Sequence, residues 1–210
     1  MVSTGRPRRR DSQRAIFRAA AEEFARRGFD AARVDRIAAR ARVNKAMLYY
    51  HYRSKLGLYV EVLRDMFRAV GGRIRVIADG DGPADGKLDA WIAALVEEAA
   101  ARPWLPSIML REIASGAPHI DHDTFSMMNA VYGGVRDVIV QGQRERIFRE
   151  TDPLLAYLTI LPPVLIFFAR QQVVTHRRGL RDLDVAAPLG QDEFVRHVQA
   201  SARAMLRRDI

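Results

Sequence analysis

The sequence contains no cysteine, so this chain of 210 residues can form neither a disulfide nor a thiolate metal site. It also shows no convincing alternation of apolar and polar residues, which is the pattern of a half-buried strand. A glycine-rich phosphate loop and a nucleophile elbow are missing as well, and the five histidines are scattered along the chain. We therefore predict an all-helical protein that is not an enzyme and that needs no cofactor.

No apolar run reaches the roughly 20 residues that a helix needs to cross a membrane. The most apolar segment, residues 154–169, is shorter than that, and Pro162 and Pro163 interrupt it. The basic N-terminus is not followed by an apolar signal segment. We therefore expect a cytoplasmic protein with no membrane partner, in which other helices cover this segment.

What the sequence does have is a strongly uneven charge. Residues 1–55 hold 15 Lys and Arg against 5 Asp and Glu, a net charge of +10, whereas residues 56–210 hold 19 against 20. A small basic module on a neutral body is typical of a protein that neutralises phosphates, although an anionic membrane surface is an alternative target. Residues 1–10, with four arginines between Arg6 and Arg10, are predicted to form a flexible basic arm.

Helical periodicity dominates the rest of the chain. Ser12 or Asp11 can cap a first helix that ends near Gly28, and Ser54 can cap a long helix that reaches about residue 77. The other predicted helices cover residues 34–41, 45–51, 87–101, 104–115, 122–149, 153–176 and 191–208. The predicted fold class is thus all-α with about nine helices, divided into a three-helix domain at 1–55 and a helical domain at 56–210.

Two short helices joined by a tight turn, between Val34 and Lys55, carry the functional signal. Asn44 can cap the second of them, and the N-terminal residues of such a helix can enter the major groove of DNA. Side chains near this helix offer hydrogen bonds to bases and phosphates, and the free N–H groups after Ser54 form a phosphate site. The residues predicted to contact DNA are Arg33, Arg36, Asn44, Lys45, Ala46, Tyr49, Tyr50, His51 and Lys55.

This region resembles the N-terminal domain of the TetR family over residues 11 to about 60. The residues that carry the resemblance are Phe24, Gly28-Phe29, Ile37-Ala38, Leu48-Tyr49-Tyr50-His51-Tyr52, Ser54-Lys55 and Leu58-Tyr59. The resemblance implies a dimer of nine-helix subunits whose first three helices bind a palindromic operator. It further implies that the C-terminal domain binds a small apolar ligand and that the last two helices pair the subunits.

Two positions depart from the family pattern. Arg42 stands where the family usually has glycine, and a positive φ at a residue with a side chain costs about 1 kcal/mol. Arg33 stands where the family often has a capping Thr or Ser; it cannot cap the helix, but it can still reach a phosphate. Both departures change which operator contacts we expect. Neither argues against DNA binding, which remains the prediction.

The helical C-terminal domain has more large apolar side chains than the packing of its helices requires. An effector pocket between helices is therefore predicted, with ordinary core packing as the alternative for each single residue. The predicted ligand-binding residues are Trp91, Met109, Phe125, Met128, Tyr132 and Phe167. The predicted dimer interface contains Leu165, Val195, Val198, Ala202 and Met205, with docking of the final helix on its own subunit as the alternative.

The run from His119 to Asp123 has residue types that suit zinc or nickel. Consecutive residues rarely converge on one ion, so we predict no metal site and a helix cap by Asp121 or Asp123 instead.

The function that the sequence favours is a DNA-binding transcriptional regulator, expected to be a homodimeric repressor that a small-molecule effector releases from its operator. An activator or a regulator without an effector is the alternative, and an enzyme or a membrane-surface protein is less favoured.

Overall fold

The computed structural model describes residues 9–176, 184 and 187–208, and within them the regular structure is nine α-helices with one isolated bridge between Phe148 and Arg207. This confirms the all-α prediction. The helices are α1 (Arg9–Ala31), α2 (Val34–Arg40), α3 (Lys45–Tyr52), α4 (Lys55–Asp79), α5 (Ala84–Ala101), α6 (Leu105–Ala114), α7 (His122–Arg144), α8 (Pro153–His176) and α9 (Gln191–Leu206).

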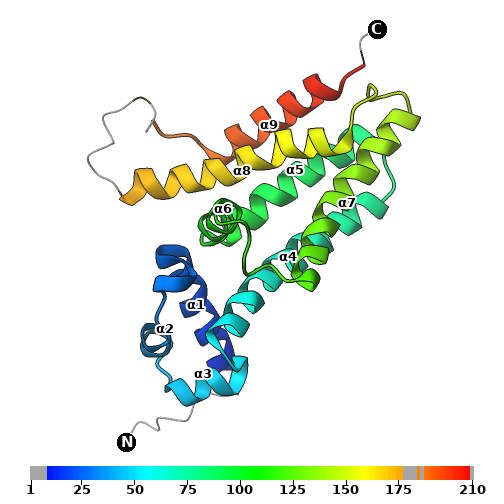
Figure 1. Ribbon diagram of the computed structural model, residues 1–210. Helices are drawn as coiled ribbons and strands as arrows, with labels where there is room; N and C mark the ends of the chain where they lie inside the picture. Colours follow the sequence, from blue (N-terminus) through cyan, green and yellow to red (C-terminus); the bar gives the residue numbers. More distant parts are fainter. Residues whose placement is uncertain (1–8, 177–183, 185–186, 209–210) are drawn as a thin grey trace, which may run out of the picture.

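The helices form two connected parts (Figure 1). We call α1–α3, residues 9–54, the head, and α4–α9 the body. Helix α4 leads from the head into the body and packs along α7, while α8 and α9 lie on the far side of α5. Helices α4 and α7 pack tightly at Gly134, where a side chain would collide with Ile74.

The head is attached to the body through aromatic and hydrogen-bonded contacts. The Phe29 ring, at the end of α1, lies 4.1 Å from the His119 ring and 5.2 Å from the Tyr59 ring. The Tyr59 hydroxyl donates to the buried carboxylate of Glu112 at 2.6 Å, and His119 Nδ1 lies 2.8 Å from the same oxygen. Burial, and then this hydrogen bond, raises the pKa of Tyr59. The junction therefore joins α1, α4 and α6 in one packed cluster.

The predicted caps at Asn44, Ser54 and Asp121 are confirmed, whereas Asp11 and Ser12 lie inside α1, which begins at Arg9, and do not cap it. The side chains of Asn44, Ser54 and Asp121 each accept a hydrogen bond from the backbone N–H three residues further on, at 2.8, 2.9 and 2.9 Å. Asp152 accepts one from the N–H two residues on, at 2.7 Å. These bonds satisfy backbone donors that have no partner within the helix, which is why α3, α4, α7 and α8 begin where the sequence predicts.

Some predicted boundaries are wrong. Helix α1 begins at Arg9, so Arg9 and Arg10 belong to a helix, while residues 1–8 of the predicted arm lie outside the described residues. Helix α7 ends at Arg144 rather than at 149, because Arg146 has a φ of 59° and turns the chain. The N–H groups of Ile147 and Phe148 then bond to the carbonyl of Gly142, and the Phe148 ring folds back over this glycine.

Helix α8 spans the predicted residues 153–176, and the two prolines that interrupt its apolar run do not break the helix. It continues for 24 residues with both prolines inside. Both prolines are exposed, so the carbonyls that lose their N–H partners, those of Leu158 and Thr159, lie on the solvent side and can bond to water. By length and composition, residues 153–175 of α8 could cross a membrane, and 28% of its most apolar window is buried. The expectation that other helices cover this segment therefore holds for only part of it.

Candidate nucleic-acid interface

The turn between α2 and α3 places the two helices against α1. Ile37 on α2 and Leu48 on α3 are fully buried in the core shared with α1. The Val43 N–H donates to the carbonyl of Ala38 at 3.0 Å and closes the turn, and Arg42 within it has a positive φ, 55°. The turn thus keeps the helix-turn-helix form without glycine, at a cost of about 1 kcal/mol in backbone strain.

Helix α3 has one buried face and one exposed face. Leu48 and Tyr52 point into the core, and the Tyr52 hydroxyl donates to the carbonyl of Gln13 on α1 at 3.2 Å. Burial raises the pKa of Tyr52 to about 12. On the other face the side chains are open to solvent, and Tyr50 is 64% exposed. The exposed residues on α3 are Lys45, Ala46, Met47, Tyr49 and Tyr50.

The cations predicted to contact DNA differ in how free they are. Lys45 Nζ lies 2.5 Å from Asp35 on α2, so the two helices share an ion pair at the start of α3. Arg36 lies 3.9 Å from the buried carboxylate of Glu23. Arg33 is exposed, does not cap α2, and forms no ion pair with any residue that the structure describes. Arg33 is therefore the most available of the three for a phosphate.

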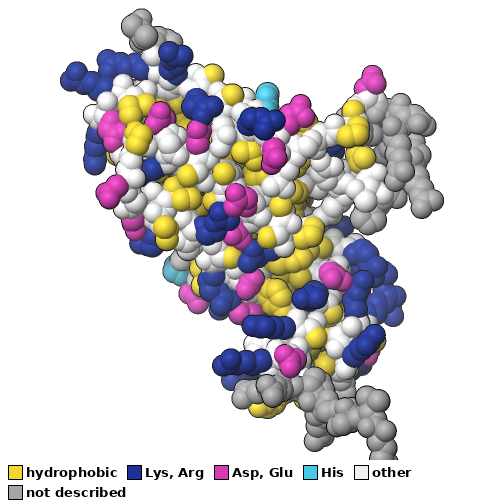
Figure 2. All heavy atoms as spheres, turned by 180° about the vertical axis from the view of Figure 1, so that it is seen from behind, with side chains coloured by type: hydrophobic (Ala, Val, Ile, Leu, Met, Phe, Trp, Pro, Cys, Tyr) yellow, Lys and Arg dark blue, Asp and Glu magenta, His cyan; other side chains and the backbone are white. Residues whose placement is uncertain are grey.

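Lys55 and His51 are turned toward the protein. The Lys55 ammonium donates to the carbonyl of Asp30 at 3.1 Å and lies 4.5 Å from the centre of the Phe29 ring. His51 Nε2 is buried and has no hydrogen-bond partner among the described residues. The Lys55 ammonium is thus engaged within the head and the His51 ring is partly covered, so the exposed residues on α3 offer the more accessible DNA contacts. In Figure 2 many Lys and Arg side chains gather on the lower part of the molecule, where the head lies.

The predicted effector residues divide into three groups. Trp91 and Tyr132 lie on either side of Tyr157, with ring centres 6.3 and 5.4 Å from it. Met109 and Phe167 are buried, Met128 is half-buried, and Phe167 stacks on Phe194 of α9 at 4.0 Å. Phe125 is 56% exposed, so it does not line an interior pocket. Of the predicted effector residues, the structure therefore brings Trp91 and Tyr132 together in an aromatic cluster with Tyr157.

One buried polar atom in this aromatic cluster has no hydrogen-bond partner within the part of the chain that the structure describes. Trp91 is fully buried, and its Nε1 has no hydrogen-bond partner among the described residues. Burial raises the pKa of Tyr157 to about 12. A buried donor without a partner costs about 1–3 kcal/mol, and an acceptor on a bound molecule would remove that cost. Tyr157 is the residue that sequence reasoning left out of the predicted site, because nothing in the sequence showed that α8 brings it between Trp91 and Tyr132.

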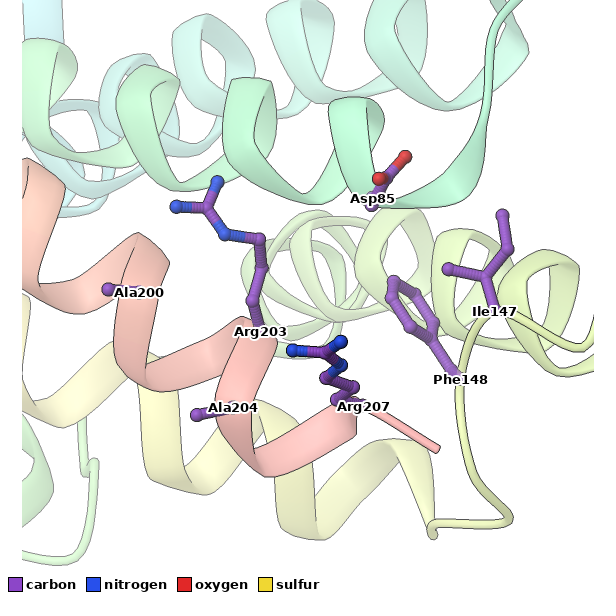
Figure 3. A pocket seen from close by; sticks show the side chains of 7 residues that line it. All are labelled: Asp85, Ile147, Phe148, Ala200, Arg203, Ala204 and Arg207. Atoms are coloured by element: carbon purple, nitrogen blue, oxygen red, sulfur yellow. The ribbon is translucent and has the colours of Figure 1, made fainter. Parts of the chain in front are cut away.

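A separate hollow of about 470 Å³ lies at the end of the body farthest from the head (Figure 3). Arg203 of α9 and Arg207, just after α9, form one side of it, and Phe148 forms another. Arg203 is paired with Asp89 of α5. None of the six predicted effector residues lines this hollow.

The predicted dimer residues are largely covered within their own chain. Leu165, Val198 and Ala202 are buried within their own chain, and Val195 and Met205 are half-buried. The apolar stripe of α9 packs on α5 and α8, which is the alternative of docking on its own subunit. The exposed apolar residues lie instead on α8, at Leu154, Leu155, Leu158, Ile166 and Val173. Because α8 is apolar on all sides, its sequence periodicity could not distinguish its inner face from its outer face.

The segment from His119 to Asp123 has structural partners. Asp121 caps α7, and Arg64 of α4 donates to Asp121 at 2.7 Å and to Asp123 at 3.3 Å. The capping hydrogen bonds from Thr124, followed by Arg64, lower the pKa of Asp121. Among the described residues no group of three metal-ligating side chains comes together.

The geometry defines a class: a helix-turn-helix head with a capped, exposed recognition helix on an all-helical body. Residues 16–62 match the family model described as bacterial regulatory proteins, tetR family. The fold agrees with that of the TetR family regulator PfmR from Thermus thermophilus, with a TM-score of 0.72 and 21% identity over 92% of this chain and 99% of that one. Residues 16–62 thus belong to the DNA-binding domain of the TetR family, and the chain as a whole has the fold of a TetR family regulator.

Two curated relatives are similar over shorter stretches. The transcriptional repressor SCO4008 of Streptomyces coelicolor is 37% identical over 109 residues, which are 51% of this chain and 53% of the relative. The transcriptional activator FasR of Mycolicibacterium smegmatis is 50% identical over 56 residues, 26% of each chain. The chain therefore spans about half the length of the first relative and about a quarter of the second.

Proposed function

We propose that this protein is a cytoplasmic, homodimeric transcriptional regulator that binds a palindromic DNA operator. The observation that carries the proposal is the exposed face of α3, held by the Asn44 cap, the buried Leu48 and the hydrogen bond of Tyr52 to α1. A helix with this orientation can enter the major groove, with Lys45 and Ala46 near base edges and Tyr49 near the backbone. The net charge of +10 in the first 55 residues supplies the attraction to phosphates.

We propose repression as its mode of action, because the relative that matches over the longer stretch is named a repressor. The name of the second relative favours activation as the alternative. A transcription assay distinguishes the two: a repressor lowers transcript from a promoter that contains its operator, and an activator raises it.

The proposed effector is a small, largely apolar molecule that carries a hydrogen-bond acceptor. The cluster of Trp91, Tyr132 and Tyr157 offers aromatic surfaces, and Trp91 Nε1 offers a buried donor without a partner. Binding there would favour one arrangement of α4, α5, α7 and α8 over another. Because α4 continues into the head, the two heads of a dimer would no longer match half-sites about 34 Å apart.

The proposed dimer interface is the exposed face of α8. Leu155, Leu158, Ile166 and Val173 form an apolar stripe along this helix, and Ala200 and Ala204 are the small exposed residues of neighbouring α9. Two such helices from each subunit would form a four-helix interface. An exposed apolar stripe of this length is otherwise unfavourable in water.

The experiment that tests the proposal is a footprint of the protein on the DNA that flanks its own gene. We expect protection of two half-sites about one helical turn apart, or a multiple of that distance. Non-specific coating of the fragment, with no protected sequence, would contradict the proposal. A gel shift at increasing salt gives a second measurement, because log K should fall linearly with log salt.

A further inference from the structure

A cleft of about 700 Å³ separates the first turns of α1 from α4 and from the junction of α5 and α6. It is a different place from the aromatic cluster around Trp91, because none of that cluster's residues lines it. Its volume is within the range of sites that bind small molecules. The residues that line it are Arg10, Gln13, Arg14, Phe17, Arg18, Tyr52, Glu61, Asp65, Ala101, Arg102 and Trp104.

One wall of the cleft is a row of cations. Arg10, Arg14 and Arg18 are four residues apart on α1, so their side chains lie on the same face of the helix. All three are exposed, and none forms an ion pair or a side-chain hydrogen bond with a residue that the structure describes. Each guanidinium presents a planar set of donors that matches a carboxylate.

The floor of the cleft is aromatic. The rings of Phe17 and Trp104 meet edge to face, with centres 6.2 Å apart, and both side chains are half-buried. In Figure 2 an apolar patch with charged side chains on its border is visible where the head meets the body. Aromatic surfaces of this kind stack on flat rings and on guanidinium groups.

The opposite wall restricts what the cleft can accept. Glu61 and Asp65 of α4 face it; Glu61 is paired with Arg68 at 2.5 Å, and Asp65 lies 3.7 Å from Arg102. These carboxylates repel a polyanion such as a DNA backbone but can accept a hydrogen bond from a hydroxyl group. The charge pattern therefore favours a ligand with an anion at one end and a neutral hydrogen-bond donor at the other.

We propose that this cleft is a second small-molecule site, and that its ligand class is an aromatic monocarboxylate bearing a hydroxyl group. The carboxylate pairs with Arg14 and Arg18, the ring packs on Phe17 and Trp104, and the hydroxyl donates to Glu61 or Asp65. The bound molecule touches α1 of the head and, in the body, α4 and Trp104 just before α6, so its binding responds to the separation of head and body. This site is additional to the proposed interior effector site and does not depend on it.

Isothermal titration calorimetry of the full chain with 6-hydroxy-2-naphthoate tests the proposal without DNA. We expect one site per chain with a dissociation constant below about 1 mM. The variant Arg14→Gln/Arg18→Gln should bind at least about tenfold more weakly, and the neutral 6-hydroxy-2-naphthamide should show the same loss on the wild type. Both substitutions are on exposed side chains, so circular dichroism should show unchanged helical content.

Arg40→Gln is the matched control. Arg40 lines a separate hollow on the other side of α1, which Arg14 and Arg18 also border, and it is paired with Glu22. Its removal should leave naphthoate binding unchanged, whereas Trp104→Phe should weaken it. Wild-type affinity in Arg14→Gln/Arg18→Gln, or no heat of binding at all, would overturn the site. Loss of binding in Tyr132→Leu instead would assign the naphthoate to the interior cluster and overturn the proposal equally.

Discussion

The head and the body are both built from helices, but they expose opposite kinds of surface. In the head the apolar residues are buried and the exposed face of α3 is polar and aromatic, with an ion pair between Lys45 and Asp35 at its start. In the body the longest apolar helix, α8, leaves Leu158 and Ile166 in solvent. The exposed surface of the head is thus suited to contact with a polyanion, whereas the exposed face of α8 in the body is apolar and suited to packing against another apolar surface.

The largest effect expected in this comparison is on the head. Lys45→Ala/Tyr49→Ala removes two exposed contacts from each α3 without touching its buried face. Because a good base contact is worth about 1–3 kcal/mol and a dimer has two copies, operator affinity should fall by at least about 100-fold. A quantitative gel shift measures this, with Arg136→Ala on the surface of α7 as the control. Unchanged affinity, with unchanged helical content, would mean that α3 does not contact the operator.

The second prediction concerns the body. It compares the effect of added charge on the exposed face of α8 with its effect on the buried stripe of α9. Leu158→Glu/Ile166→Glu places charges on the exposed face, so light scattering should give the 23.8 kDa mass of one chain with the fold retained. Val198→Glu places a charge in the interior and should lower the free energy of unfolding by about 3 kcal/mol or more. If the first variant remains a dimer, the interface lies elsewhere. Val76→Glu, on an exposed part of α4, is the control for added charge.

The third prediction compares one buried tyrosine in each part. Burial raises the pKa of Tyr52 in the head and of Tyr157 in the body to about 12. In the unfolded chain a tyrosine ionises near pH 10, so the unfolded state loses these protons first. The stabilising contribution is complete below pH 10 and is lost as the pH rises toward 12.

Urea unfolding at pH 9 and pH 11 measures this loss. Tyr52→Phe and Tyr157→Phe should each reduce the difference between the two pH values by about 1 kcal/mol. Tyr50→Phe, which replaces an exposed ring on the same helix as Tyr52, should leave the difference unchanged. An equal pH dependence in all three variants would show that other groups dominate it.

The smallest expected effect is at Arg42 in the turn of the head. Arg42→Gly relieves the positive φ, which costs about 1–2 kcal/mol for a residue with a side chain, but adds about 0.5–1 kcal/mol of unfolded-state entropy. The net gain should be about 0.5 kcal/mol, seen as a melting temperature higher by about 1–2 °C. Arg40→Gly, at the helical end of α2, should lower it. A lower melting temperature in Arg42→Gly would mean that the arginine side chain stabilises the turn.

The sequence predicted the head far better than the body because its signals there are local. Asn44 and Ser54 act within three residues of their own positions, and the alternation of buried Leu48 with exposed Tyr49 and Tyr50 is a property of one helix. The sequence also marked Arg42 as the unusual position of the turn, but it left open whether the turn would differ or be strained; the structure keeps the positive φ there.

The body depends on contacts between residues far apart in the chain. No local pattern shows that Tyr157 lies between Trp91 and Tyr132, or that the stripe of Val198 and Ala202 faces inward. Lys55 is an instructive case in the head itself. Its position suggests a phosphate contact, but its partner is the carbonyl of Asp30, 25 residues earlier, so its orientation could not be derived from neighbouring residues.

The contact of Gly134 with Ile74 has a mechanical consequence. Gly134 has no side chain, so Ile74 Cγ2 occupies the space that a side chain on α7 would need, and α4 packs tightly on α7 at that point. Ile74 is five residues from the body end of α4 and 19 residues from its head end, which correspond to about 7 Å and about 28 Å of helix. A rigid tilt of α4 about this contact would therefore move its head end, near Lys55, about four times as far as its body end, near Asp79.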